Sequence, residues 1–237
     1  MKDKPSTRGE NRRDVGEHAG LKFVPQEAIQ HLSRVDPTMA KLISVAGPFS
    51  MELRTIHNLF AELARNIIYQ QLHANAAGAI HEHVRALFRN KVIRPREVLA
   101  APEEQLLGAG LSRAKLAALK DLALKTIDGT VPKTLASLER MEDEEIIARL
   151  TTVRGIGRWT VEMLLIFRLG RADVLPVGDY AIRKGYALAY GLDEMPKPGE
   201  LTLRAEPWRP FRTVASWYLW RATELPAENF GLTIRQP

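Results

Sequence analysis

The sequence LTTVRGIGRWTVEMLLIFRLGRADVLPVGDY, residues 150–180, places a short glycine turn before an apolar segment and a single aspartate after it. Residues 143–151 have the pattern of a helix, and VRGIGR at 153–158 interrupts that pattern. Apolar residues at helical spacing then resume and continue to Gly170. The stretch therefore predicts a helix, a glycine hairpin and a second helix, followed by a turn that presents Asp179.

The glycine hairpin has two interpretations. Glycine allows positive φ and has no Cβ, so another backbone can approach Gly155 and Gly157 closely. The amides at the start of the following helix carry the positive end of its dipole and form a site for a phosphate oxygen. Such a contact would position a DNA duplex without reading its base sequence. The alternative is an ordinary tight turn between two packed helices.

Asp179 also has two interpretations. An aspartate before a helical segment is a preferred N-cap, and Gly178 suits the turn that precedes it. A carboxylate held in place can instead stabilise positive charge that develops during a reaction, or it can orient a water molecule. Taken alone, the residue favours the cap.

The remainder of the chain has a helical pattern almost throughout. Asp36 followed by Pro37 marks the start of one helix, and Ser112 marks the start of another that ends just before Gly129. Apolar residues recur at spacings of three and four within residues 51–72. No segment has a convincing strand pattern. We therefore expect an all-α protein of about ten helices joined by short loops.

Composition limits the functions that are open to this chain. Its 237 residues suit one large domain or two small subdomains that share a cleft. The absence of cysteine excludes a disulfide framework, a cysteine-bound iron–sulfur cluster and a thiolate nucleophile. The six histidines lack metal-ligand spacing, so no side-chain metal site is expected. A net charge of +6 permits binding to nucleic acid without demonstrating it.

The N-terminal residues 1–25 are polar and charged, and we expect a disordered basic tail there. They contain no apolar core of a signal peptide, and no apolar run approaches the ~20 residues that cross a bilayer. An intracellular protein is expected, in the cytoplasm or nucleoid of a prokaryote or in the nucleus of a eukaryote. We expect no membrane partner and a monomer.

The hairpin, the apolar helix and the aspartate together resemble the helix-hairpin-helix (HhH-GPD) DNA glycosylase superfamily. Residues 63–80 resemble the helix and loop that enter the minor groove in that family, and residues 106–123 resemble a second characteristic segment. AIQHLSRVDPTMAKLI and WRPFRTVASWYLWRA resemble the flanks of the 3-methyladenine DNA glycosylase II branch. The resemblance covers about residues 26–225.

The resemblance implies a fold of two helical subdomains flanking a cleft. The glycosylase core would occupy residues 26–237. Residues 55–190 would form the central subdomain with the hairpin at 153–158, while residues 26–54 and 191–237 would form the second. Some relatives carry a mixed α/β domain upstream. We expect that domain to be absent here.

The resemblance implies that Asp179 is the catalytic residue and faces the sugar of an extruded nucleotide. Cleavage of an N-glycosidic bond builds positive charge on the deoxyribose, which a fixed carboxylate stabilises. An O-glycosidase usually needs a second carboxylic acid. An alkylated purine is already cationic and leaves as a neutral base, so one carboxylate suffices.

Aromatic residues are expected to line the base pocket. Family members that also cut the DNA backbone have a lysine where this chain has Trp159, so the resemblance implies a monofunctional enzyme that uses water. Trp220 matches a tryptophan of the base pocket in this branch, and indole faces attract cationic rings. The further candidates are Tyr180 and Met163. Packing in the core is the alternative for Trp220, Tyr180 and Met163, and we expect it for Trp217.

The expected DNA contacts fall into three groups. The hairpin would bind backbone phosphate, the 70–72 segment would fill the gap left by the extruded base, and the second characteristic segment would bind backbone elsewhere. Either Gln71 or Leu72 is the wedge, and His73 stands where relatives often have serine. The residues are Gly155, Ile156, Gly157, Arg158 and Thr160; Gln70, Gln71 and Leu72; and Ser112, Arg113 and Lys115.

The sequence thus predicts a monofunctional DNA glycosylase of base excision repair that acts on duplex DNA containing alkylated purines of the 3-methyladenine and 7-methylguanine type. The alternatives are a glycosylase for oxidised or mismatched bases, a non-catalytic DNA-binding module and a helical interaction protein. No cofactor is required. The resemblance suggests a structural Na⁺ or K⁺ at the carbonyl groups of Val153 and Gly155.

Overall fold

The computed structural model describes residues 20–55 and 58–226. These residues form thirteen α-helices and two short 3-10 helices, and no strand occurs among them. The all-α prediction is confirmed, although the helices are shorter and more numerous than expected. No helix in this part of the chain is both long and apolar enough to span a bilayer.

Of the predicted tail at residues 1–25, residues 1–19 lie outside the described part of the chain. Its last part is packed, and there the prediction of disorder is wrong. The Lys22 amide donates to the Gly170 carbonyl at 2.9 Å. The Phe23 ring lies 6.3 Å from the ring of Phe49 and 6.4 Å from that of Phe211, both in edge-on contact. This aromatic contact is the physical reason that the segment is ordered.

The chain divides into two compact units. Unit 1 consists of Met1–Arg54 and Leu169–Pro237, and unit 2 is Thr55–Arg168. The expected division placed residues 169–190 with the central part of the chain, but they belong to unit 1. The reason is that the helix at Tyr180–Tyr190 packs against the last helix of the chain.

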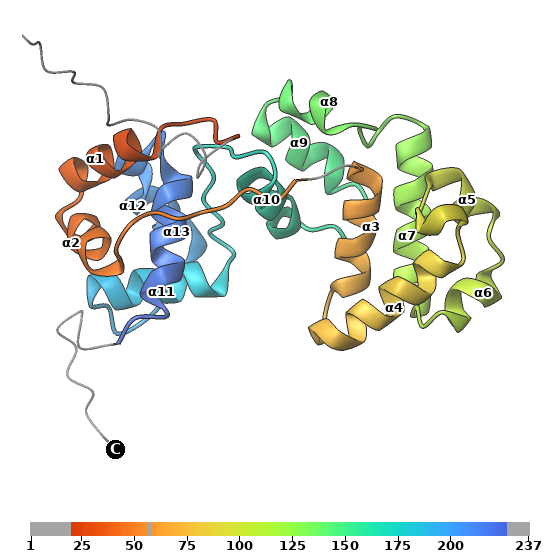
Figure 1. Cartoon of the computed structure of the whole chain (residues 1–237). Coiled ribbons are helices and arrows are strands. Elements are labelled where there is room, and N and C mark those ends of the chain that lie inside the picture. Colours follow the sequence, from red (N-terminus) through yellow and green to blue (C-terminus); the bar gives the residue numbers. More distant parts are fainter. Residues whose placement is uncertain (1–19, 56–57, 227–237) are drawn as a thin grey trace, which may run out of the picture. The chain divides into compact units, whose positions relative to one another are not determined.

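Unit 1 is built around its C-terminal helix. α13 (Arg212–Ala222) is buried on nearly all sides and packs against α1, α2 and α11 (Figure 1). The helices and 3-10 helix around it are α1 (Pro25–Val35), α2 (Pro37–Ala46), α11 (Tyr180–Tyr190), α12 (Pro198–Arg204) and η2 (Glu206–Trp208).

The contact between α11 and α13 depends on a glycine. A Cβ built on Gly185 would lie 1.9 Å from the carbonyl oxygen of Leu219, so the two backbones meet at a distance that no side chain permits. Glycine at a helix interior costs about 0.5–1 kcal/mol relative to alanine. Here glycine is required despite that cost, because only a residue without a Cβ lets the two helices approach this closely.

Asp36 joins three elements of unit 1. Its Oδ1 accepts from the amides of Thr38 and Met39 at 3.0 Å, which confirms the predicted N-cap of α2. Its Oδ2 accepts from the Tyr190 hydroxyl and from Trp208 Nε1, the latter at 2.9 Å. Burial, together with the neighbouring Asp36 carboxylate, raises the pKa of Tyr190. One carboxylate therefore anchors α11 and η2 to the start of α2.

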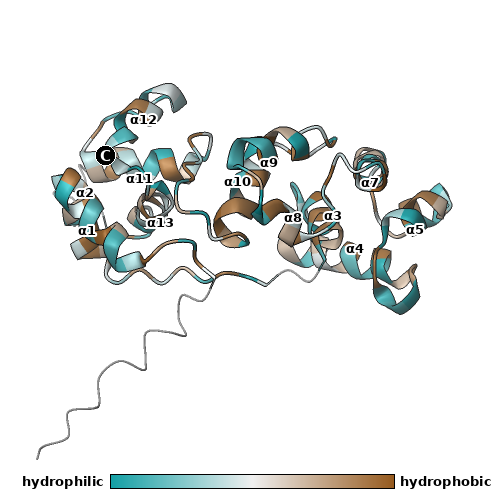
Figure 2. Cartoon of the chain, turned by 90° about the horizontal axis from the view of Figure 1, so that it is seen from above, coloured by the Kyte–Doolittle hydropathy of each residue, from teal (hydrophilic) through white to brown (hydrophobic). Residues whose placement is uncertain are grey.

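Unit 2 contains the hairpin. α7 (Arg113–Ile127) packs against α3, α5 and α6. α9 packs against α10, and Figure 2 shows that α10 is strongly hydrophobic. The elements are α3 (Leu59–Tyr69), α4 (Ala74–Ala86), η1 (Arg89–Lys91), α5 (Pro95–Ala100), α6 (Glu103–Gly108), α8 (Leu135–Glu139), α9 (Asp143–Leu150) and α10 (Arg158–Phe167).

The local signals in unit 2 are mostly confirmed. Ser112 Oγ accepts from the Lys115 amide at 3.3 Å, and Gly129 follows α7 with a φ of +88°. The periodic segment 51–72 is helical over a shorter range than its pattern suggests. α3 begins only after Asn58, whose side chain accepts from the Ala61 amide at 3.1 Å.

Candidate active site

The hairpin joins α9 to α10 and is held by its own apolar residues. Leu150, Val153 and Ile156 are buried, and the Ile156 amide donates to the Val153 carbonyl at 3.0 Å. Gly155 has a φ of +79°, a left-handed conformation that favours glycine. The predicted helix, hairpin and helix are confirmed, although α10 ends at Phe167 instead of Gly170.

The exposed side of the hairpin leaves the start of α10 accessible. Gly157 is the N-cap of α10, and a glycine has no side chain that could accept from the first amides of the helix. Both Gly155 and Gly157 are exposed. A Cβ on Gly157 would have no heavy atom within 4 Å. The first amides of α10 are thus presented at an open surface, as a phosphate site requires.

Arg158 and Thr160 were both predicted to contact DNA. Arg158 donates to both oxygens of Glu144, at 2.5 and 3.1 Å, and to Glu162 Oε1 at 3.0 Å. The bond to Glu144 is the largest cause that raises the pKa of Arg158. Glu162 is only 4% exposed, and the ion pair with Arg158 offsets part of the cost of burying its charge. Thr160 is half-buried on α10.

The segment between α3 and α4 turns sharply at Gln71, which has a φ of +55°. A residue other than glycine costs about 1–3 kcal/mol in such a conformation. The Gln71 side chain is exposed, and Leu72 is 39% exposed. Both wedge candidates therefore remain at the surface, next to His73 at the N-cap of α4.

Gln70 and the residues predicted from the second characteristic segment take different positions. Gln70 Nε2 donates to the Gly155 carbonyl at 2.7 Å, and Lys115 Nζ donates to the carbonyls of Ile68 and Gln70 at 2.6 and 3.0 Å. Both side chains therefore bond within unit 2. Ser112 caps α7, while Arg113 is exposed at its first turn.

Asp179 stands at the N-terminus of α11. Its Oδ1 accepts from the Ile182 amide at 2.9 Å, so it is an N-cap, as its sequence context alone suggested. The same oxygen accepts from Trp220 Nε1 at 3.3 Å. The carboxyl is half-buried. The structure thus brings together two of the predicted site residues, Asp179 and Trp220, while Tyr180 follows Asp179 directly and is 63% exposed.

One face of α13 bonds to the segment 171–179, which ends at Asp179. Thr213, Ser216 and Trp220 lie at positions i, i+3 and i+7 of this helix and share a face. Thr213 Oγ1 donates to the Arg171 carbonyl at 2.6 Å and accepts from the Val174 amide at 3.0 Å. Ser216 Oγ donates to the Val174 carbonyl at 3.2 Å.

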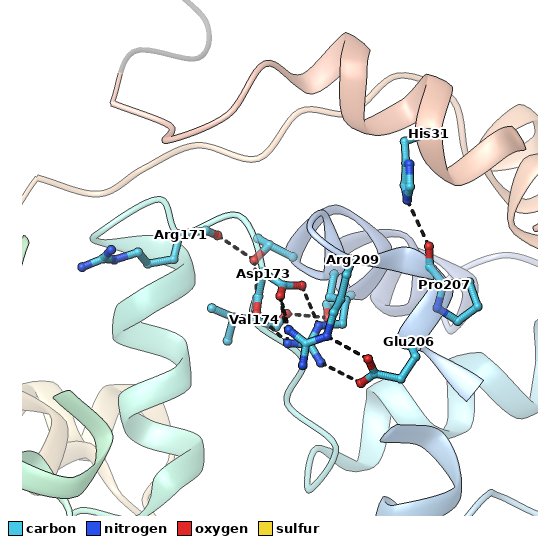
Figure 3. A network of polar contacts seen from close by, with 10 residues as sticks. His31, Arg171, Asp173, Val174, Glu206, Pro207 and Arg209 are labelled. Atoms are coloured by element: carbon cyan, nitrogen blue, oxygen red, sulfur yellow. Dashed lines mark hydrogen bonds and ion pairs between the residues drawn. The ribbon is translucent and has the colours of Figure 1, made fainter. Parts of the chain in front are cut away.

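An ion-pair cluster secures the same segment at its start. Asp173 accepts from Arg209 Nη1 at 2.6 Å and from Arg212 Nε at 2.6 Å (Figure 3). Glu206 accepts from Arg209 Nε at 2.9 Å. The His31 ring also bonds to the Pro207 carbonyl at 3.0 Å. The cluster and the polar face of α13 together bond the segment 171–179 to α13 at Arg171, Asp173, Val174 and Asp179.

The sequence interpretation did not identify Thr213, Ser216 or Asp173. Thr213 and Ser216 are completely buried polar residues in the otherwise apolar helix α13. Buried hydroxyls need hydrogen-bond partners, and that is the signal that could have drawn attention to them.

The other predicted pocket residues differ in burial. Trp159 is 51% exposed and Met163 is half-buried, both on α10 of unit 2. An indole exposed to this extent is not a core residue. Trp217 is buried against Phe49 and Tyr218, as expected for a core position.

Comparison with known proteins places these features in a family. Residues 64–210, well over half of the chain, match the model of the HhH-GPD superfamily base excision DNA repair proteins. The chain is 40% identical over 200 residues to DNA-3-methyladenine glycosylase 1 of Schizosaccharomyces pombe, covering 82% of this chain and 86% of that protein. It belongs to the HhH-GPD superfamily.

Solved structures agree with this assignment. The structure of the S. pombe 3-methyladenine DNA glycosylase in complex with abasic DNA matches with a TM-score of 0.70 and 38% identity, covering 85% of this chain and 98% of that one. A DNA-3-methyladenine glycosidase from Bacillus halodurans matches with a TM-score of 0.74 and 32% identity, covering 82% and 88%. The HhH-GPD fold and the 3-methyladenine glycosylase branch are thus confirmed.

Proposed function

We propose that this protein is a monofunctional DNA glycosylase that removes alkylated purines from duplex DNA by hydrolysing the N-glycosidic bond. The observation that carries the proposal is the half-buried carboxylate of Asp179, held at the start of α11 by the Ile182 amide and the Trp220 indole. The names of the relatives, 3-methyladenine DNA glycosylases, support the same reaction.

The chemistry follows from the charge of the substrate. As the bond to an alkylated purine breaks, positive charge moves from the base to the deoxyribose, and the base leaves neutral. Asp179 stabilises the sugar cation and orients or deprotonates the attacking water. The bond from Trp220 of the buried helix α13 matters because a preorganised charge needs no rearrangement during the reaction.

Base selection is assigned to the aromatic residues. Trp220 offers its indole to a cationic ring beside Asp179, and Tyr180 is a further candidate in the same unit. Trp159 and Met163, both on α10 of unit 2, are candidates that rest on the family resemblance alone. A cation–π contact contributes about 1–2 kcal/mol when it is desolvated. The rest of the discrimination between cationic and neutral bases comes from the weakened glycosidic bond of the cationic base.

The hairpin is assigned to backbone binding through the first amides of α10. Gly157→Val adds a side chain at an open surface, so the fold should be unaffected. We expect about tenfold or weaker binding to every duplex, damaged or not, in electrophoretic or fluorescence titrations. Gly199→Val, also at an open position but outside the segments predicted to bind DNA, is the matched control. Unchanged binding by a folded Gly157→Val variant would make the hairpin purely structural.

The monofunctional assignment depends on Trp159. We expect borohydride, added during reaction on an alkylated duplex, to trap no covalent adduct, because no amine stands at this position to form a Schiff base with the sugar. Gel electrophoresis of the reaction products makes the measurement. An efficiently trapped adduct would mean that a lysine elsewhere acts as a lyase.

Incubation with methylated duplex DNA and chromatography of the released bases tests the proposed function. Release of 3-methyladenine and 7-methylguanine is the expected result. Release of oxidised or mismatched bases alone would favour a glycosylase of another specificity. DNA binding that depends steeply on salt, without release of any base, would indicate a non-catalytic DNA-binding module.

The enzyme acts as a monomer on DNA inside the cell and needs no cofactor for the reaction. A structural Na⁺ or K⁺ would be held by the carbonyls of Val153 and Gly155. Each of these oxygens accepts one bond within the protein, from the Ile156 amide and from Gln70, and each carbonyl has a second lone pair.

A further inference from the structure

One face of α7 supports both the hairpin and the end of α3. The face consists of Lys115, Ala118, Asp121 and Lys125, at successive spacings of three, three and four. Toward α3, Lys115 Nζ donates to the carbonyl of Ile68 in the last turn of that helix and to that of Gln70, its C-cap. We call this set of residues the α7 support face.

The other residues of the α7 support face meet the hairpin. Asp121 Oδ2 accepts from the Arg154 amide at 2.7 Å and from Lys125 Nζ at 2.8 Å. Lys125 Nζ also donates to the Thr152 carbonyl. A Cβ on Gly155 would lie 3.5 Å from Ala118 Cβ. Thr152, just before the hairpin, and Arg154 within it are therefore bonded to α7, and Gly155 lies close to Ala118 of the same helix.

Gln70 closes the connection between the two supported segments. Its backbone carbonyl is bonded by Lys115, and its side-chain amide donates to the Gly155 carbonyl at 2.7 Å. The residue that immediately precedes the two wedge candidates is therefore bonded directly to the hairpin.

We propose that Gln70 and Lys115 are positioning residues that hold the Gln71–Leu72 turn in a fixed frame with the hairpin. This rests on the proposed function, in which the turn fills the gap left by the extruded base while the hairpin holds the backbone. Binding of the backbone then fixes where the wedge enters the duplex. The two side chains act on base extrusion without contacting DNA themselves.

The conformation of the turn explains why it needs such support. Gln71 has a left-handed backbone that a non-glycine residue rarely adopts, and Leu72 exposes an apolar side chain to water. Neither feature would hold the turn in place by itself. Burial lowers the pKa of the Lys115 ammonium, and its bonds to the carbonyls of Ile68 and Gln70 offset part of the cost of that burial.

The test uses Gln70→Met, which keeps the size of the side chain and removes the donor. Two duplexes carry the same alkylated purine, one opposite its normal partner base and one opposite an abasic site, where extrusion costs less. In single-turnover reactions we expect the variant to slow release from the paired duplex about tenfold, as for one lost hydrogen bond, and from the unpaired duplex less than about threefold. Affinity for undamaged duplex should stay within about twofold.

Gln105→Met, at an exposed glutamine of α6 in the same unit, is the matched control and should change neither rate. Equal slowing on the two duplexes would overturn the proposal, as would no slowing at all. A loss of affinity for undamaged duplex would also overturn it, because Gln70 would then be a DNA contact.

Hydrogen exchange of the free protein separates this proposal from the proposed function. We expect the amides of residues 69–73 to exchange faster in Gln70→Met than in the wild type, while α13 is unchanged. If the wild type releases no base, hydrogen exchange alone tests whether Gln70 holds the turn. Unchanged exchange across residues 69–73 would show that Gln70 does not hold the turn.

Discussion

Asp179→Asn is expected to lower the rate of base release by a factor of about 100 to 1000 or more, the size of effect seen when one preorganised electrostatic group is removed from an active site. The substitution removes the charge that would face the developing sugar cation. It keeps a side-chain oxygen that can accept from the Ile182 amide, so the cap of α11 persists. Single-turnover kinetics on a methylated duplex, with affinity measured separately, makes the comparison.

Affinity for DNA is expected to change little in this variant, because the phosphate contacts are assigned to the hairpin of unit 2. Asp193→Asn, at an exposed aspartate of unit 1, removes the same charge and should leave the rate unchanged. Should Asp179→Asn excise bases at the wild-type rate, Asp179 would be a helix cap and nothing more.

Gly185→Ala is expected to have the largest effect on stability. The added Cβ would lie 1.9 Å from the Leu219 carbonyl, and the obstacle is backbone, which cannot swing aside like the end of a side chain. α11 and α13 must separate, so we expect a loss of about 3 kcal/mol or more in the free energy of unfolding. For a chain of this size the melting temperature would fall by roughly 10 °C.

The control for this substitution is Gly199→Ala. Gly199 lies in α12, and a Cβ there would have no heavy atom within 4 Å. Alanine should therefore be neutral or stabilising by up to about 1 kcal/mol. Calorimetric melting of both variants tests the pair. A Gly185→Ala variant as stable as the wild type would mean that α11 and α13 do not approach as closely as described.

Much of the fold could be predicted from local signals. Asp36 and Ser112 cap the helices that their sequence context indicates, and the glycine hairpin forms between α9 and α10. These features depend on interactions between residues a few positions apart, which a single sequence records directly. The packing of Phe23 and the assignment of α11 to unit 1 depend on partners far along the chain. Local pattern does not contain that information.

The candidate site shows the same division. Asp179 and the hairpin follow from a motif, whereas their supports do not. Thr213 lies 34 positions after Asp179, and its role depends on the turn of α13 that faces the 171–174 backbone. Lys115 and Gln70 were expected to contact DNA because their segments resemble two characteristic segments of the glycosylase family. Their donors instead meet carbonyls within unit 2, which only the tertiary structure reveals.

The charge of the substrate is the central element of the proposed function. The most direct measurement compares single-turnover release of 3-methyladenine and 7-methylguanine with release of uracil and 8-oxoguanine by the wild type and by Trp220→Ala. We predict faster release of the cationic bases by the wild type. Trp220→Ala should narrow the gap by about 5- to 30-fold, the worth of one cation–π contact, without inverting it. Because Trp220 also bonds Asp179, all rates should fall, and the ratio isolates base recognition. Faster release of uracil or 8-oxoguanine than of the methylated purines would contradict the proposal.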